Sequence, residues 1–223
     1  MFKIAIDGPS GAGKSSIAKA IAKSMGIVYV DTGALYRTIG YYVRSKGVDP
    51  KDGEGVTELL PEINIEVKYE DGAQYVYLNG KNLGDRIREP EISMYASAVS
   101  AIPTVREFLL ETQRSIARSN SVVMDGRDIG TVILPDAEVK IFLTASDECR
   151  AMRRYLELKE KGTETSYEEV LADMRERDHN DTNRSVAPAV PAADAVFLDN
   201  SGYTVEETLA EALKIINGKL ANV

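Results

Sequence analysis

Residues 8–15, with the sequence GPSGAGKS, satisfy the pattern G-x-x-x-x-G-K-[ST] at every defined position. Such a loop binds phosphate, because its glycines let backbone N–H groups turn towards an anion and the following helix adds positive partial charge. Lys14 would reach the β- and γ-phosphates of a nucleotide, and the Ser15 hydroxyl would bind Mg²⁺. A glycine-rich turn without a ligand would have no use for this Lys-Ser pair. The sequence therefore predicts a site for a nucleoside triphosphate.

Charged side chains elsewhere in the chain suit the transfer of a phosphoryl group. Asp125 follows an apolar run at residues 122–124, where a carboxylate could hold Mg²⁺ through water; an ordinary strand-ending turn is the alternative. Phosphoryl transfer requires positioned charge rather than a covalent nucleophile. Residues 150–184 contain several arginines together with several glutamates, so some of these arginines must form ion pairs with glutamates on the surface. The remaining arginines would belong to a lid that closes over two nucleotides. The arginines of residues 150–184 are Arg150, Arg153, Arg154, Arg175, Arg177 and Arg184.

The elements that position these residues alternate between strands and helices. This order indicates an α/β fold in which helices flank a parallel five-stranded sheet. Ligands bind beyond the carboxyl ends of the strands in such a sheet, so the phosphate loop and Asp125 would lie at that edge. Apolar runs predict strands at residues 4–6, 27–30, 122–124, 139–143 and 195–198, and helical periodicity predicts helices at residues 14–25, 34–46 and 205–217.

The chain changes character at residues 62–88. Apolar and polar residues alternate along residues 63–69, and Asp71-Gly72 and Asn79-Gly80 are hairpin-turn signals. We expect a small antiparallel insert of three strands in this segment.

Three helices have recognisable N-terminal caps. Thr104 with Glu107, and Ser166 with Glu169, have the spacing of capping boxes. Ser146 would cap a further helix, whose first turn carries two acidic residues.

The composition of the 223 residues excludes several classes of protein. The formal net charge of −8 argues against DNA or RNA as a partner, because a phosphate backbone demands a basic face. The single cysteine, Cys149, fits a reducing compartment, and the single histidine, His179, rules out a multi-histidine metal site. No apolar run approaches the ~20 residues that span a bilayer, and the N-terminus enters a strand without room for a signal peptide. We therefore expect a cytoplasmic protein.

Four blocks of sequence resemble the bacterial cytidylate kinases, a family of nucleoside monophosphate kinases. They are DTGALYR at residues 31–37, DGRDIGTV at 125–132, ERDHNDTNR at 176–184 and VPAADA at 190–195. With the phosphate loop, the resemblance covers nearly the whole chain. It implies a core of about residues 1–61, 89–146 and 185–223. A nucleoside monophosphate (NMP)-binding insert would then span about residues 62–88, and a helical lid about residues 147–184.

The resemblance also implies an activity, the transfer of the γ-phosphoryl group of ATP to CMP or dCMP, with Mg²⁺ required. ATP would be bound by Gly8, Pro9, Ser10, Gly11, Ala12, Gly13, Lys14, Ser15 and Ser16. Catalysis would depend on Lys14, Arg127, Arg177 and Arg184. CMP would be bound by Thr32, Tyr36, Arg37, Ser97, Arg106, Arg127, Asp128, Arg177, Asp181 and Arg184.

Within the CMP set, the resemblance assigns parts of the nucleotide to particular residues. Tyr36, Arg37 and Arg127 would face the acceptor phosphate. Ser97, Arg106 and Asp128 would read the cytosine edge, Arg177 and Asp181 would lie near the sugar, and Arg184 near the bound nucleotide.

Two positions depart from the family pattern. Thr32 stands where serine is familiar, which keeps the hydroxyl. The loop ends Lys14-Ser15-Ser16, where many relatives have Lys-Gly-Thr, so either serine hydroxyl could bind the metal.

The chemistry of cytosine agrees with the assignment of Asp128 and Arg106. Cytosine presents an N4 amine donor beside the N3 and O2 acceptors. A carboxylate suits the N4 amine, and a guanidinium suits N3 and O2. The alternative for Asp128 is a salt bridge with Arg127 or another arginine.

Other functions remain open on the sequence alone. A phosphate-loop kinase could act on another nucleoside monophosphate or on a small metabolite. A hydroxyl acceptor would need a positioned base, whereas a phosphate acceptor needs arginines, and the sequence supplies arginines. A GTP-dependent switch would need a guanine-reading N-K-x-D element, which the sequence lacks. A structural nucleotide-binding subunit would not need the acceptor-like residues. We expect a monomer that binds ATP and CMP or dCMP, and neither nucleic acid nor membrane.

Overall fold

The structure is a computed structural model that describes residues 1–70 and 73–221. The chain forms two compact units, which we call unit 1 (Met1–Ile27 and Val123–Val223) and unit 2 (Val28–Val122). Each unit contains some of the residues predicted to bind nucleotides. The expected Asp71-Gly72 turn lies outside the described residues.

Five short strands form the predicted parallel sheet, in the order β2-β6-β1-β7-β8. Ile4, Ala5 and Ile6 of β1 are fully buried, as expected of a central strand that is covered on both faces. Ile6 lies opposite Ile141 in the pairing of β1 with β7. The strands are β1 (Lys3–Asp7), β2 (Val28–Asp31), β6 (Val122–Asp125), β7 (Val139–Thr144) and β8 (Val196–Asp199).

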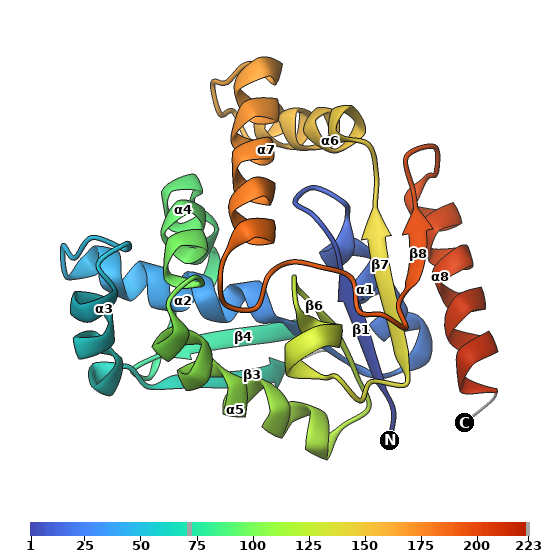
Figure 1. Ribbon diagram of the computed structural model, residues 1–223, viewed down its shortest axis with the longest axis horizontal. Coiled ribbons are helices and arrows are strands. Elements are labelled where there is room, and N and C mark those ends of the chain that lie inside the picture. Colours follow the sequence, from blue (N-terminus) through green and yellow to red (C-terminus); the bar gives the residue numbers. More distant parts are fainter. Residues whose placement is uncertain (71–72, 222–223) are drawn as a thin grey trace. The chain divides into compact units, whose positions relative to one another are not determined.

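In unit 1, α1 (Lys14–Met25) begins at the Lys-Ser pair that ends the phosphate-loop motif. Ile17, Ala18, Ile21 and Ala22 form its buried stripe, which confirms the helical pattern of the sequence. α1 contacts β1 and α8 (Val205–Leu220), and α8 also contacts β7 and β8 (Figure 1). The loop is therefore fixed between a central strand and a packed helix.

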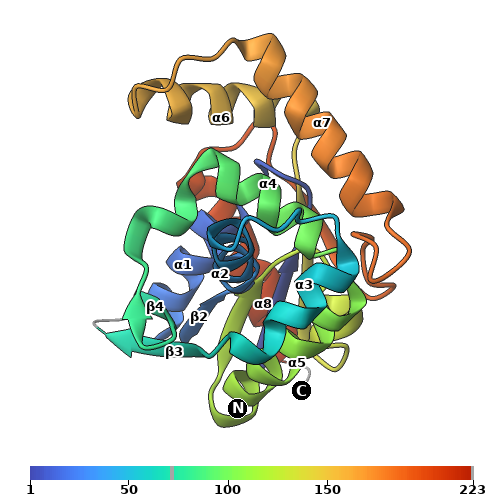
Figure 2. The ribbon, with the colours of Figure 1, turned by 90° about the vertical axis from the view of Figure 1, so that its left-hand side faces the viewer.

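Two further helices of unit 1 pack against each other at an angle, α6 (Asp147–Glu160) and α7 (Tyr167–Asn183) (Figure 2). The Ser146 side chain caps α6 as predicted. Ser166 and Glu169 form the predicted capping box at the start of α7. These caps satisfy N–H groups that each helix leaves without partners, and so fix where the two helices begin.

Unit 2 has its own hydrophobic core, built around α2 (Thr32–Ser45). Leu35, Ile39 and Val43 are fully buried in a cluster with apolar residues of the insert. The predicted antiparallel sheet is present in the order β3-β4-β5. The other elements of unit 2 are α3 (Gly53–Leu59), η1 (Leu60–Glu62), β3 (Ile65–Glu70), β4 (Ala73–Leu78), β5 (Lys81–Asn82), η2 (Gly84–Arg88), α4 (Pro90–Val99) and α5 (Pro103–Ser119).

Some local predictions are wrong. Thr104 does not cap a helix, because α5 begins at Pro103, and proline is favoured at the first helical position, where no N–H is needed. The Thr104 hydroxyl lies instead 2.7 Å from the hydroxyl of Thr57. α2 begins at Thr32 rather than at residue 34, because the Asp31 carboxylate caps the helix.

Several short elements were not predicted. They include α3 and a π-helical turn named η3 (Ile129–Ile133), which follows β6. Among the helices described for residues 1–70 and 73–221, none combines the length and apolar character that crossing a membrane needs.

Candidate active site

The phosphate loop leaves the carboxyl end of β1 and passes very close to β7. Gly8 has a φ of 148°, and a Cβ atom at this position would lie 1.9 Å from the carbonyl oxygen of Leu143. Only glycine fits such an approach. Gly11 and Gly13 also have positive φ angles, as the inward-turning backbone of the loop requires.

The Lys14 side chain turns back over this loop. Its Nζ donates a hydrogen bond of 2.6 Å to the carbonyl oxygen of Pro9. Burial, followed by the positive charge of Arg127, lowers the pKa of Lys14 well below its ordinary value. The phosphates of a bound nucleotide would add negative charge here and favour the ammonium form.

Ser15 connects the loop to the end of β6. Its Oγ donates a hydrogen bond of 2.7 Å to Oδ2 of Asp125, which is only 5% exposed. A hydroxyl and a carboxylate so close together supply the hard oxygen ligands that Mg²⁺ prefers. Within the described part of the chain, no group of three or more His, Cys, Asp or Glu side chains could hold a metal ion. Mg²⁺ is commonly bound by one or two protein groups plus nucleotide phosphates, so these two residues fit that mode.

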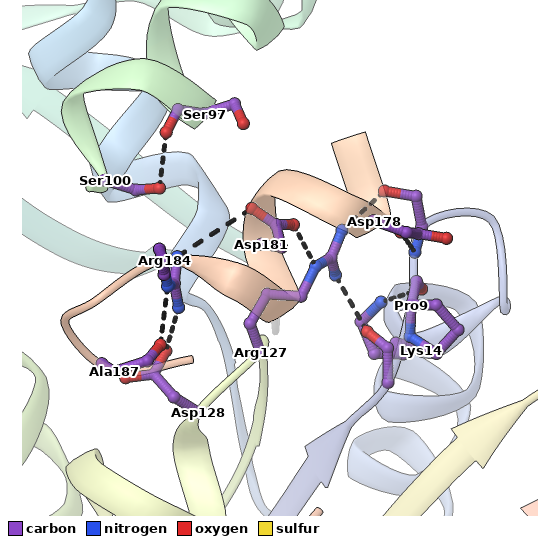
Figure 3. A network of polar contacts seen from close by, with 12 residues as sticks. Pro9, Lys14, Ser97, Ser100, Arg127, Asp128, Asp178, Asp181, Arg184 and Ala187 are labelled. Atoms are coloured by element: carbon purple, nitrogen blue, oxygen red, sulfur yellow. Dashed lines mark hydrogen bonds and ion pairs between the residues drawn. The ribbon is translucent and has the colours of Figure 1, made fainter. Parts of the chain in front are cut away.

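Arg127 is held between the phosphate loop and α7 (Figure 3). Its Nε donates to Asp181 at 2.9 Å, its Nη2 to the Ser10 hydroxyl at 2.8 Å and its Nη1 to the Gly8 carbonyl oxygen at 3.2 Å. Burial alone would raise the pKa of Asp181, but Arg127 and other arginines hold that pKa below its ordinary value. The guanidinium is therefore fixed beside the loop by an ionised carboxylate.

Two residues that sequence reasoning did not assign to the site also bind the loop. Asp178 accepts a hydrogen bond of 2.8 Å from the Ser10 N–H. Arg150, which is 4% exposed, donates to the Ser10 carbonyl oxygen and to Asp178. The signal for Asp178 was its spacing of three from Asp181, which places both carboxylates on one face of α7.

Asp178 and Asp181 also line a pocket of unit 1. The other lining residues of this pocket include Pro9 and Arg127. The Arg127 guanidinium in this lining is paired with Asp181, so the pocket presents charges of both signs beside the phosphate loop.

Asp128 is paired with an arginine. Its Oδ1 lies 3.4 Å from Nη2 of Arg184, so a salt bridge, the predicted alternative for Asp128, is present (Figure 3). Arg184 also donates to the Ala187 carbonyl oxygen at 2.6 Å and lies 3.9 Å from Asp181. Both members of the pair are buried, which limits the screening of their interaction by water.

Asp7, the last residue of β1, holds the turn that follows Asp128. Its carboxylate accepts hydrogen bonds of 2.8 Å from the N–H groups of Ile129 and Gly130. Burial raises the pKa of Asp7 to about 6, although the two hydrogen bonds oppose the rise.

In unit 2, Asp31 fixes the first turn of α2 and the Arg37 side chain. One carboxylate oxygen accepts from the Ala34 N–H at 2.9 Å and the other from Nη2 of Arg37 at 2.8 Å. Gly33 makes this possible, because a Cβ there would lie 2.9 Å from Nη1 of Arg37. The Arg37 guanidinium therefore lies directly over the helix start.

A second cation of unit 2 is held against an aromatic ring. The guanidinium carbon of Arg106 lies 5.5 Å from the ring centroid of Tyr36, and Nη1 donates to the Ser100 carbonyl oxygen at 3.0 Å. The Ser100 hydroxyl in turn donates to the Ser97 carbonyl oxygen at 2.8 Å. Arg106 is thus oriented by contacts on two sides.

The predicted site residues form one group in each unit. In unit 1, Arg177 joins the group through its charge, which lowers the pKa of both Lys14 and Asp181. The unit 1 group comprises residues 8–16 with Asp125, Arg127, Asp128, Arg177, Asp181 and Arg184, and the unit 2 group comprises Thr32, Tyr36, Arg37, Ser97 and Arg106.

Comparison with known proteins shows which family the chain belongs to. The family model described as "Cytidylate kinase" matches residues 4–218. The chain belongs to the cytidylate kinase family. A curated cytidylate kinase from Fervidobacterium nodosum is 53% identical over 214 residues, covering 96% of this chain and 95% of the relative. One from Caldicellulosiruptor saccharolyticus is 48% identical over 221 residues, covering 99% and 98%.

A solved structure supports the fold. A gluconokinase from Sinorhizobium meliloti is 18% identical, with a TM-score of 0.50 and coverage of 99% of this chain and 94% of that one. The resemblance found in the sequence is therefore confirmed at the level of the family, and the phosphate-loop kinase fold is confirmed as well. As a member of the cytidylate kinase family, the chain is a phosphotransferase.

Proposed function

We propose that the protein transfers the γ-phosphoryl group of ATP to CMP or dCMP, giving ADP and CDP or dCDP. One observation carries the proposal: in a chain of the cytidylate kinase family, Arg127 is held by Asp181 beside the phosphate loop. The transferred group carries negative charge over its equatorial oxygens in the transition state. A cation that is already in position stabilises this charge without reorganisation.

On the ATP side, the loop N–H groups bind the phosphates, and Lys14 binds the β- and γ-phosphate oxygens. Ser15, with Asp125 through water, would hold Mg²⁺, which would neutralise phosphate charge. The hydrogen bond between these two residues favours Ser15 over Ser16 as the ligand.

On the acceptor side, each group of residues has one task. Arg37, Tyr36 and Arg127 bind the phosphate of CMP, and Thr32, at the start of α2, belongs to the same set of CMP-binding residues. A phosphate acceptor is already anionic, so it needs cations rather than a general base.

The base and the sugar are bound by the remaining residues. Asp128 accepts from the cytosine N4 amine, Arg106 donates to the cytosine acceptors, and Ser97 completes the base site. Arg177 and Asp181 bind the sugar, and Arg184 lies near the nucleotide.

The functional division of the chain is part of the proposal. The core is about residues 1–61, 89–146 and 185–223, the NMP-binding insert about 62–88, and the lid about 147–184. Such a lid would exclude water, which would otherwise accept the phosphoryl group. We place the enzyme in the cytoplasm as a monomer.

A kinase for another nucleoside monophosphate is the second candidate, and one observation favours it. Asp128 is paired with Arg184, so its carboxylate would be shared between an arginine and the proposed base. A coupled assay of ADP release with CMP, dCMP, UMP, AMP and GMP separates the two. We expect CMP and dCMP to exceed UMP by at least about 10-fold in kcat/KM, from one charge-assisted hydrogen bond. Equal or higher values for another acceptor would contradict the assignment.

A further inference from the structure

Gln74, near the start of β4, binds the main chain of Asp31 through both ends of its side-chain amide. Its Oε1 accepts a hydrogen bond of 2.8 Å from the Asp31 N–H, and its Nε2 donates one of 3.2 Å to the Asp31 carbonyl oxygen. Both residues belong to unit 2. One side chain therefore satisfies both main-chain polar groups of another residue, as a neighbouring strand would.

The place of Asp31 in the sheet explains this contact. β2 is an edge strand of the parallel sheet. An edge strand has N–H and C=O groups that point away from the sheet and need partners other than a strand. The Gln74 side chain supplies these hydrogen-bond partners at Asp31, the last residue of β2, where the chain turns into α2.

Gln74 is itself held by the apolar face of the insert. Gln74, Val76 and Leu78 alternate along β4 and share one face of the strand. Val76 and Leu78 are 6% and 7% exposed, in the same cluster as Leu35 and Ile39 of α2. β4 is therefore anchored to α2 by apolar packing and to the end of β2 by Gln74.

Asp31 connects this anchor to Arg37. The Asp31 carboxylate binds Nη2 of Arg37 and the Ala34 N–H, and the short approach at Gly33 keeps the guanidinium over the helix start. A shift of the Asp31 main chain would therefore move the Arg37 guanidinium as well.

We propose that Gln74 is a positioning residue, which orients Arg37 for the phosphate of the nucleoside monophosphate. This proposal rests on the proposed function, in which Arg37 binds that phosphate. A guanidinium that is already oriented loses less conformational freedom when it binds a phosphate. The insert would then contribute to phosphate binding without touching the phosphate.

Steady-state kinetics of Gln74→Ala test the proposal, with Lys81→Ala on the exposed strand β5 as the matched control. We expect KM for CMP to rise about 10-fold, which corresponds to the loss of about one hydrogen bond's contribution. KM for ATP should stay within about 2-fold, since the ATP-binding residues belong to unit 1. Gln74→Glu keeps the acceptor and loses the donor, so its KM should lie between those of the wild type and Gln74→Ala.

A double-mutant cycle separates positioning from a merely structural role. If Gln74 acts through Arg37, Gln74→Ala should raise KM for CMP in the wild type but leave it unchanged in an Arg37→Ala background. Equal fold-changes in both backgrounds would overturn the proposal, as would a rise in KM for ATP that matches the rise for CMP.

A measurement without substrate keeps this test separate from the proposed function. Gln74→Ala, but not Lys81→Ala, should speed hydrogen exchange of the Asp31 amide and shift the ¹⁵N resonance of Arg37 Nε. If the wild type fails to phosphorylate CMP while these two signals change, the proposed function fails and the link from Gln74 to Arg37 stands. An Arg37 resonance that is the same in wild type and Gln74→Ala would overturn the positioning role.

Discussion

The Ser15 hydroxyl donates a hydrogen bond of 2.7 Å to the Asp125 carboxylate, and this contact joins the phosphate loop to the end of β6. Ser15 lies in the first turn of α1, which follows β1, and Asp125 is the last residue of the neighbouring strand β6. This is the expected place of a ligand site at the carboxyl edge of a parallel sheet. The general phosphate-loop pattern favours Ser15, but the departure from the family pattern at residues 15 and 16 left Ser16 open. The hydrogen bond points to Ser15 as the residue that takes the metal with Asp125.

Ser15→Ala and Ser16→Ala test this choice as a matched pair. We expect Ser15→Ala to raise the Mg²⁺ concentration for half-maximal activity by about 10-fold, because the cation loses a ligand oxygen. Ser16→Ala should leave it within about 2-fold of wild type. A Mg²⁺ titration at saturating ATP and CMP measures both, and the reverse order would assign the metal to Ser16.

Lys14→Ala should lower kcat by several orders of magnitude, because the transition-state charge loses its nearest cation. Lys23→Ala, an exposed lysine in the last turn of the same helix, is the control. Circular dichroism should show both variants folded. If Lys14→Ala kept more than about a tenth of the wild-type kcat, Lys14 would have no part in catalysis.

Asp128→Ala should change the choice of base. An ionised carboxylate that accepts from the cytosine N4 amine contributes about 1.5–3 kcal/mol, or roughly 10- to 150-fold in kcat/KM. Uracil has a carbonyl oxygen at that position, which the carboxylate repels, so activity with UMP should change little or improve.

The control for this variant is Arg184→Ala, because Asp128 and Arg184 are paired. Arg184→Ala leaves the carboxylate in place and should preserve the preference for CMP over UMP. The kcat/KM values of each protein for both substrates are needed. Were CMP and UMP to fall by the same factor in Asp128→Ala, the residue would serve phosphate positioning or stability instead.

The pKa of Asp7, raised from 3.8 to about 6, gives a prediction about pH and stability. The folded protein holds this proton more tightly than the unfolded chain, so the protonated carboxyl favours folding. The stabilisation of the folded protein by protonated Asp7 is therefore fully present below about pH 4, and it is lost as the pH rises through about 6. A shift of about two pKa units corresponds to about 3 kcal/mol in the free energy of unfolding.

Urea unfolding at several pH values measures this effect as a difference between wild type and Asp7→Asn, which cannot ionise. Relative to the variant, wild type should lose stability between about pH 4 and pH 6, and the difference should be constant above about pH 7. The ¹³C resonance of the Asp7 carboxyl should titrate near pH 6. A midpoint near pH 4 would show that burial does not penalise the charged form.

The phosphate loop and the strands were predictable because their signals are local. An apolar run of three residues that is followed by an acid is enough to place a strand end, as at Asp125. The start of α5 was not predictable from the sequence, because Pro103 and Thr104 both suit a helix N-terminus and only the fold decides between them.

The supporting contacts of the site depend on tertiary structure. Asp178 binds the loop from a helix more than 160 residues away, and its spacing from Asp181 was the single local signal. Gln74 gave no signal, because its role requires the insert to dock on an edge strand that comes earlier in the chain. Sequence reasoning thus found the residues proposed to touch nucleotides better than the residues that hold them.

Transfer of label from [γ-³²P]ATP tests the central claim most directly. With CMP present, the account predicts that label leaves ATP and appears in the β-phosphate of CDP, one for each ADP formed. Little should appear in inorganic phosphate. Label that appears mainly in phosphate, or in another nucleoside diphosphate when all monophosphates are offered together, would contradict the assignment of the protein as a CMP kinase.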